Sequence, residues 1–121
     1  MKILVVDDSA TMRMIVIKSL RQAGFVNAEV VEAGGAKEAL QKLAAGGIDL
    51  MLCDVNMPEI TGIELVKVVK MKMAGLPVVM ITTESSPEMK QKMLEAGAAG
   101  IITKPFPPQE LTKVLAPLVK E

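Results

Sequence analysis

Residues 50–65, LMLCDVNMPEITGIEL, contain the pattern that decides the fold. The apolar run 50–53 ends abruptly at Asp54, and a short loop leads into a segment whose apolar residues recur at helical spacing. A run that is apolar at every position, rather than at alternate positions, is typical of a strand buried on both faces of a parallel sheet. The stretch therefore predicts a buried strand, an acidic strand end and a following helix.

The same unit recurs along the chain. Apolar runs that we expect to form strands occupy residues 3–6, 28–31, 50–53, 78–81 and 100–103. Four are nearly continuous, which favours burial on both faces, whereas the second is more mixed and is expected nearer a sheet edge. Five alternations of strand and helix predict an α/β fold, with an open parallel sheet and helices on both faces. The 121 residues fit one domain, spanning 1–121.

Helical periodicity fills the segments between the apolar runs. The expected helices and their apolar faces are 9 or 10 to about 23 (Met12, Ile15, Val16, Leu20), 36–45 (Ala39, Leu40, Leu43), 62–73 (Ile63, Val66, Val69, Met73), 87–96 (Met89, Met93, Leu94) and 107 or 108 onward (Leu111, Val114, Leu115, Leu118). Ser86 is expected to cap the fourth helix. Pro117 is expected to fray or kink the final turn of the last one.

The composition narrows the functional class. The 14 basic and 14 acidic residues balance, so nothing favours binding to nucleic acid or to an anionic membrane surface. No apolar run approaches the ~18 residues of a spanning helix and no signal peptide is visible, so a soluble cytoplasmic protein is expected. The chain contains no histidine, which excludes a phosphohistidine or an imidazole base of its own. The only cysteine, Cys53, lies in an apolar run and is expected to be a buried packing residue.

Chemically active residues stand where four of the five expected strands end. Asp7 and Asp8 follow the first strand, Asp54 the third and Lys104 the fifth, while Thr82 comes at the end of the fourth. The carboxyl ends of parallel strands meet at one edge of the sheet, where such folds bind their ligands. Polar strand-end residues are also ordinary turn formers and helix caps, but this does not explain why acids follow two strands and a lysine follows a third.

The chemistry of this set points to a phosphoryl group. Clustered carboxylates repel one another unless positive charge lies among them. Lys104 supplies one charge, and Mg²⁺ prefers carboxylate, carbonyl and water oxygens. Such a site suits phosphoryl oxygens, which need positive partners as charge spreads in the transition state. Asp54 is a reasonable nucleophile, since aspartyl carboxylates form acyl phosphates.

Four motifs in order, KILVVDDS (2–9), LMLCDVNMPEITGIEL (50–65), MITTES (80–85) and AAGIITKPF (98–106), carry a family resemblance. Over essentially its full length the chain resembles the receiver domain of two-component response regulators, and its single-domain chemotaxis members most. The resemblance implies a (βα)5 flavodoxin-like fold of strand order 2-1-3-4-5. It also implies a stand-alone switch, a monomer or weak dimer, that is phosphorylated by a histidine kinase and binds an output protein. Chemotaxis is one pathway in which the resemblance would place it.

The resemblance implies a role for each strand-end residue. Asp54 corresponds to the phosphoacceptor, and Asp7 and Asp8 to the Mg²⁺-binding acids. The backbone carbonyl of Asn56 corresponds to a further metal ligand. Thr82 corresponds to the switch hydroxyl that moves to bond the phosphoryl group. Lys104 corresponds to the lysine that pairs with a phosphoryl oxygen, and its bond to the following proline is expected to be cis.

Two neighbouring side chains correspond to positions that modulate loss of the phosphoryl group. Asn56 and Glu84 lie two residues beyond Asp54 and Thr82 and form the chemotaxis-type pair. The resemblance therefore implies a short-lived phosphoryl group. The alternative is that Asn56 is simply a loop residue and Glu84 a solvated one.

One position departs from the family pattern. Ile101 stands where most members carry Tyr or Phe, and its β-branched side chain has no ring and a stiff χ1. The usual coupling through aromatic rotation is therefore not available, although an output surface on the last two helices and the fifth strand is still expected. Met71 and Met73 form a second unusual feature, a local cluster of methionines. These side chains either pack the helix or form a surface for a partner.

Other functions fit the residues less well but stay open. Within the family, the chain could serve as a phosphate sink or regulate another kinase. A small phosphatase with an Asp nucleophile would carry a second Asp two residues on, where this chain has Asn56. A flavin module on the same fold would need a phosphate loop rich in Ser, Thr and Gly after the first strand, and Asp7 and Asp8 there would repel a flavin phosphate.

Overall fold

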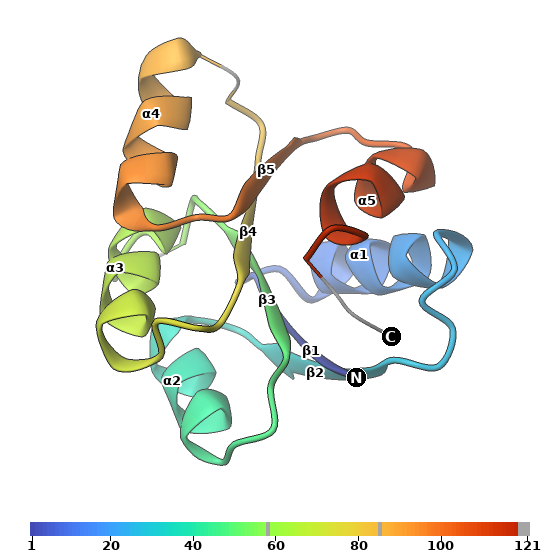
Figure 1. Ribbon diagram of the computed structural model, residues 1–121, viewed down its shortest axis with the longest axis horizontal. Helices are drawn as coiled ribbons and strands as arrows, with labels where there is room; N and C mark the ends of the chain where they lie inside the picture. The colour runs from blue at the N-terminus through green and yellow to red at the C-terminus, as the bar shows by residue number, and fades with distance from the viewer. Residues whose placement is uncertain (58, 85, 119–121) are drawn as a thin grey trace.

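A computed structural model describes residues 1–57, 59–84 and 86–118. Pro58 and Ser85, which belong to two of the quoted motifs, lie outside the described residues. Strand and helix alternate five times, as predicted (Figure 1). The elements are β1 (Lys2–Val6), α1 (Ala10–Gln22), β2 (Glu29–Ala33), α2 (Ala36–Ala44), β3 (Leu50–Asp54), α3 (Gly62–Lys72), β4 (Val78–Thr82), α4 (Pro87–Ala96), β5 (Gly100–Thr103) and α5 (Pro108–Leu115).

The five strands form one parallel sheet of order β2-β1-β3-β4-β5, which confirms the predicted flavodoxin-like topology. Helices α1 and α5 cover one face, and α2, α3 and α4 cover the other (Figure 1). The register pairs Val6 with Cys53 and Thr82 with Thr103. The carboxyl ends of these strands therefore meet at one edge, where the polar residues of the sequence pattern gather.

The strands differ in burial as their places in the sheet require. Every residue of β3 and β4 is buried, and β2 is an edge strand, as expected from their sequences. The expectation that residues 100–103 are buried on both faces is wrong, because β5 forms the other edge and only Ile102 is buried. An apolar run alone does not distinguish a central strand from an edge strand.

Side chains at alternate strand positions build two separate cores. Leu4 and Val6 of β1 pack on the side of α2, α3 and α4, whereas Ile3 and Val5 pack on the side of α1 and α5. Burying one such aliphatic side chain contributes about 1.5–3 kcal/mol, so both layers of helices are held by many comparable contributions.

The helices begin and end close to the predicted residues. Ser86 caps α4 by accepting from Met89 N–H, and α5 ends at Leu115, before Pro117. Two predicted inward residues are wrong: Ile15 is 47% exposed and Leu94 is 55% exposed. Each lies at the margin of its helix's apolar stripe, which packs less widely than the sequence pattern suggests. Among the described residues no helix combines the length and the apolarity needed to cross a membrane.

Candidate functional site

Three carboxylates converge at the carboxyl edge of the sheet. Asp7 and Asp8 directly follow β1, and Asp54 is the last residue of β3, the strand paired with β1. Each of the three offers an oxygen, and these oxygens lie within 4.8 Å of one another. Asp7 and Asp54 are buried, whereas Asp8 is exposed. The structure thus brings together the acids that the sequence placed on two separate strands.

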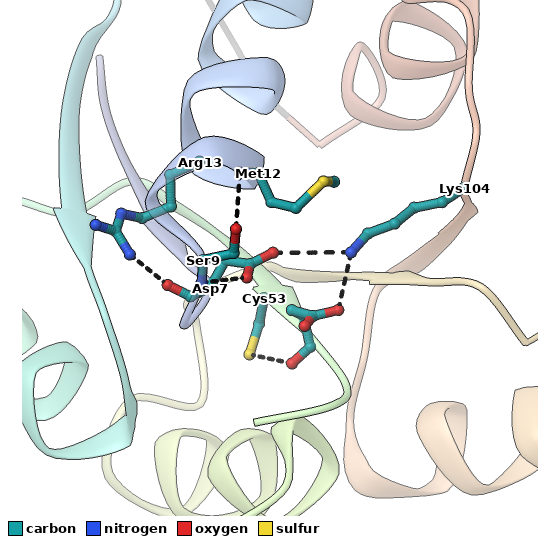
Figure 2. A network of polar contacts seen from close by, with 7 residues as sticks. Asp7, Ser9, Met12, Arg13, Cys53 and Lys104 are labelled. Carbon is teal, nitrogen blue, oxygen red and sulfur yellow. Dashed lines mark hydrogen bonds and ion pairs between the residues drawn. The ribbon is translucent and has the colours of Figure 1, made fainter. Parts of the chain in front are cut away.

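Lys104 supplies a positive charge to this acidic cluster. Its Nζ lies 3.1 Å from Asp54 Oδ1 and 3.7 Å from Asp7 Oδ2, and both ion pairs are drawn in Figure 2. The lysine comes from the loop directly after β5, and its peptide bond to Pro105 is cis, as the family resemblance implied. Because all three side chains are largely shielded from water, the attraction is stronger than between exposed charges.

The environment of Asp7 disfavours its charged form. Burial raises the pKa of the Asp7 carboxyl above its ordinary value, and the neighbouring Asp54 charge raises the pKa further. A hydrogen bond from Ser9 N–H to Asp7 Oδ1, 2.9 Å long, acts in the opposite direction and lowers the pKa. Lys104 also lowers it. A positive charge bound nearby would therefore stabilise the ionised form of the Asp7 carboxyl.

The turn between β1 and α1 is fixed by contacts that the sequence pattern did not reveal. Arg13 Nη1 donates to the backbone carbonyl of Asp7 at 2.6 Å, while its Nε pairs with Glu32 of β2 at 3.0 Å (Figure 2 shows the first contact). Ser9 Oγ accepts from Met12 N–H and caps α1. Arg13 thus ties the turn that carries the acids to the edge strand of the sheet.

The backbone carbonyl of Asp54 lies close to Gly62 and Cys53. Gly62, the first residue of α3, donates its N–H to the Val55 carbonyl at 2.8 Å. A β-carbon at Gly62 would collide with the carbonyl oxygen of Asp54, so only glycine fits there. Cys53 is buried, as predicted, and donates to the same carbonyl oxygen at 3.3 Å. Burial raises the pKa of its thiol strongly, so the thiolate does not form at neutral pH.

Among the described residues, the side chains of the remaining predicted residues make no hydrogen bond or ion pair with the three acids. Thr82 is fully buried at 0% exposure, and its hydroxyl accepts from Glu84 N–H at 3.0 Å. Its carbonyl accepts from Lys104 N–H at 2.7 Å, which links the ends of β4 and β5. The side chains of Asn56 and Glu84 are exposed. Ile101 is half-buried and packs against the core on the side of α2, α3 and α4.

The donor set of this cluster suits a hard cation. Three carboxylates within reach of one ion leave one lysine to balance them, so a divalent metal would remove the remaining repulsion. Oxygen donors of this kind are the ligands that Mg²⁺ prefers, whereas the buried thiol of Cys53 donates to a backbone carbonyl instead.

Comparison with known proteins gives the family. Residues 3–116 match the family described as response regulator receiver domain. The chain is 41% identical over 113 residues to the chemotaxis protein CheY of Pseudomonas aeruginosa, covering 92% of this chain and 90% of that protein. Its fold is similar to that of chemotaxis protein CheY4 of Vibrio cholerae, with a TM-score of 0.87, 42% identity and 98% of each chain covered.

A second similar structure contains ligands. The response regulator protein TrrA of Thermotoga maritima, solved in complex with Mg²⁺-BeF, matches with a TM-score of 0.84 and 29% identity over 98% of each chain. The acidic triad Asp7, Asp8 and Asp54 is typical of the Mg²⁺ site of such domains. A chain of this kind is a signalling protein rather than an enzyme with a separate substrate. This chain belongs to the response regulator receiver domain family.

Proposed function

We propose that this chain is a stand-alone phosphorylation switch in which Asp54 accepts the phosphoryl group of a phosphohistidine on a histidine kinase. The contact of Lys104 with both Asp54 and Asp7, at 3.1 and 3.7 Å, carries this proposal. A lysine held by two carboxylates at a buried strand end is placed to receive a third anionic group. The absence of histidine from the chain fits a domain that takes its phosphoryl group from another protein.

The transfer is a displacement at phosphorus. An oxygen of the Asp54 carboxylate forms the new bond as the bond from phosphorus to the histidine nitrogen breaks, and that nitrogen takes a proton from solvent. Lys104 Nζ, already beside Asp54 Oδ1, stabilises the charge on a phosphoryl oxygen. Among the described residues, the only hydrogen bond of the Thr82 hydroxyl is the one it accepts from Glu84 N–H, so its proton would be available to a phosphoryl oxygen.

Asp7, Asp8, Asp54 and the backbone carbonyl of Asn56 would hold Mg²⁺. The metal would supply positive charge close to the phosphoryl oxygens. The similarity to TrrA, which was solved with Mg²⁺ and a beryllofluoride group, supports this ligand set. The raised pKa of Asp7 also supports a cation at this position, because the cation would offset the cost of burying the Asp7 charge.

Asn56 and Glu84 would set how long the phosphoryl group lasts. Both side chains are exposed and follow Asp54 and Thr82 by two positions, so each would influence the water that attacks the acyl phosphate. A short lifetime is expected for this pair. Following the decay of the acyl phosphate in purified protein would test this, and a lifetime of hours would contradict it.

The output would be a protein contact on the face formed by α4, β5 and α5, as in a chemotaxis regulator. Ile101 lies on this face and is half-buried, so it offers apolar surface but no hydroxyl or ring. The link between Lys104 N–H and the Thr82 carbonyl supports a mechanical connection from the pocket to β5. A partner that binds equally with and without beryllofluoride would contradict a switch and favour a phosphate sink.

The test compares beryllofluoride binding with Mg²⁺ in the native protein and in Asp54→Ala. Binding is expected to be lost in the variant, together with phosphorylation by the small donor phosphoramidate. Asp49→Ala is the matched control, because Asp49 is exposed and bonds Lys2 N–H at the amino end of β3. Unchanged binding or phosphorylation in Asp54→Ala would overturn the assignment of the nucleophile.

A further inference from the structure

An apolar groove lies between the carboxyl-terminal halves of α2 and α3. Its volume is about 400 Å³, and its walls are formed chiefly by Leu40, Leu43, Ala44, Val69, Lys72 and Met73. An adjoining hollow of about 430 Å³ shares Lys72 and Met73 but continues into the loops at Asp49, Leu76 and Pro77. The first hollow alone is called the α2–α3 groove below, and Lys72 is the one charged residue among the described residues that line it.

This groove is separate from the phosphoryl pocket and from the α4-β5-α5 face. Helix α3 begins at Gly62, beside Asp54, and reaches the groove at its far end. Eleven residues of helix span roughly 16 Å. In Figure 1, α2 and α3 lie side by side on the face opposite α1 and α5. A ligand in the groove would therefore leave the pocket accessible.

The two helices around the groove carry an excess of positive charge. They contain five lysines and two glutamates, a difference of +3 in a chain whose total charge is zero. Both glutamates are engaged at helix starts: Glu38 accepts from Gly34 N–H, and Glu64 completes a capping box with Thr61. Among the described residues, none of the five lysines makes an ion pair, and Lys70 donates to the backbone carbonyls of Ala74 and Leu76.

The shape and the chemistry of the groove select one kind of occupant. Its walls are side chains of two helices and offer no unpaired strand edge, so an added strand could not pair there. Met73 is unbranched and adapts to the surface of a partner. We propose that the α2–α3 groove docks an acidic amphipathic helix of a partner protein, with apolar residues against Leu43 and Val69 and carboxylates toward Lys72.

A second copy of this chain is a poorer occupant. A two-fold symmetric contact would place the same surface of both copies together. The unpaired lysines of α2 and α3 would then face each other, and like charges across an interface oppose association. The acidic partner removes this repulsion and balances the lysines.

The experiment uses the chain's own methionines as probes. The protein is labelled with ¹³C at the methionine methyl groups and titrated with three synthetic helical peptides. The first has leucines at positions i, i+3, i+4 and i+7 and glutamates between them, the second replaces the glutamates by lysines, and the third replaces the leucines by serines. Only the first is expected to shift the Met73 signal. The Met14 signal, from a side chain 69% exposed on α1, should stay unchanged.

Variants separate this docking from the phosphorylation chemistry. Lys72→Glu should weaken binding of the acidic peptide about fivefold or more, since it replaces an attraction by a repulsion. Lys18→Glu, the same charge change on α1, should alter the affinity less than about twofold. Asp54→Ala should bind the peptide normally, so failure of the switch and failure of this docking are distinguishable. Equal binding of the first and second peptides, equal loss in both lysine variants, or self-association abolished by Lys72→Glu would overturn the inference.

Discussion

Lys104 and Asp54 face each other across the carboxyl end of β4, with Lys104 Nζ 3.1 Å from Asp54 Oδ1. The two residues are fifty positions apart in the sequence, and each lies at or just beyond the end of its strand. The ammonium therefore balances the charge of the Asp54 carboxylate in the absence of any ligand. Removing it exposes the anions of the pocket to each other.

Lys104→Met should weaken beryllofluoride binding in the presence of Mg²⁺. The lost interaction is a charge-assisted hydrogen bond, which contributes about 1.5–3 kcal/mol, so the affinity should fall about tenfold or more. Titration followed by methionine methyl NMR measures this change. Lys18→Met on α1 is the control, and an affinity within a factor of two of the native value in Lys104→Met would contradict the role of the ammonium.

Asp7→Asn should stabilise the metal-free protein at neutral pH. A carboxyl whose folded-state pKa is raised binds its proton more tightly in the folded state, so stability falls as the pH rises through that pKa. Asparagine keeps an acceptor for Ser9 N–H but carries no charge to be buried. Its advantage over the native protein should be full above the raised pKa and should vanish below the ordinary carboxyl value of 3.8.

Thermal unfolding of both proteins across this pH range checks the prediction. Added Mg²⁺ should narrow or reverse the difference at pH 7, because the native protein gains about 1.4 kcal/mol when the free ion is tenfold above its dissociation constant. A native protein that is more stable than Asp7→Asn in the absence of metal would contradict the raised pKa.

Gly62→Ala should destabilise the protein and disturb the acceptor. Its β-carbon would collide with the Asp54 carbonyl oxygen, which belongs to a fully buried strand and cannot move freely. Overpacking of this kind costs about 1–3 kcal/mol or more. Gly75→Ala is the matched control: a β-carbon there meets nothing within 4 Å, and a neutral or slightly stabilising effect is expected. Urea unfolding measures both, and equal stabilities would refute the steric explanation.

Glu59→Gly should stabilise the loop between β3 and α3. Glu59 has φ of 71°, in the left-handed region where a side chain costs about 1–2 kcal/mol. Glycine removes this cost but loses part of the gain through the greater freedom of the unfolded chain, leaving a net effect of up to about 1 kcal/mol. Glu59→Ala, which retains the β-carbon, should give no such gain in urea unfolding, and a similar gain from alanine would point to charge rather than backbone strain.

Much of the site was predictable because strand ends are local features. Each of Asp7, Asp54 and Lys104 is found by counting from the end of an apolar run, and parallel pairing then forces the three together. The contacts of Arg13 were not predictable in this way. It lies inside a helix pattern, and its partner Glu32 is on another element, 19 positions away. Only the folded sheet shows that they meet.

Exposure at the margins of elements was the other part that the sequence could not settle. Ile15 and Leu94 fit the helical period, yet they lie beyond the stripe that the sheet covers. Residues 100–103 were predicted to form a strand buried on both faces, yet in the part of the chain that the structure describes β5 is the edge strand beside β4. The burial of a residue depends on which helix or strand packs against it. A periodic pattern indicates only which residues could be covered in this way.

The separation of the hydrophobic interior by the sheet has a consequence for how this protein can change. Val16 of α1 and Val66 of α3 belong to different cores, and no described residue is a member of both. Substitutions at such distant sites usually combine additively. Substitutions in the core beneath α1 and α5 could therefore accumulate while the core beneath α2, α3 and α4 stays unchanged. The two faces of the sheet could then vary independently, in evolution or in a mutant library.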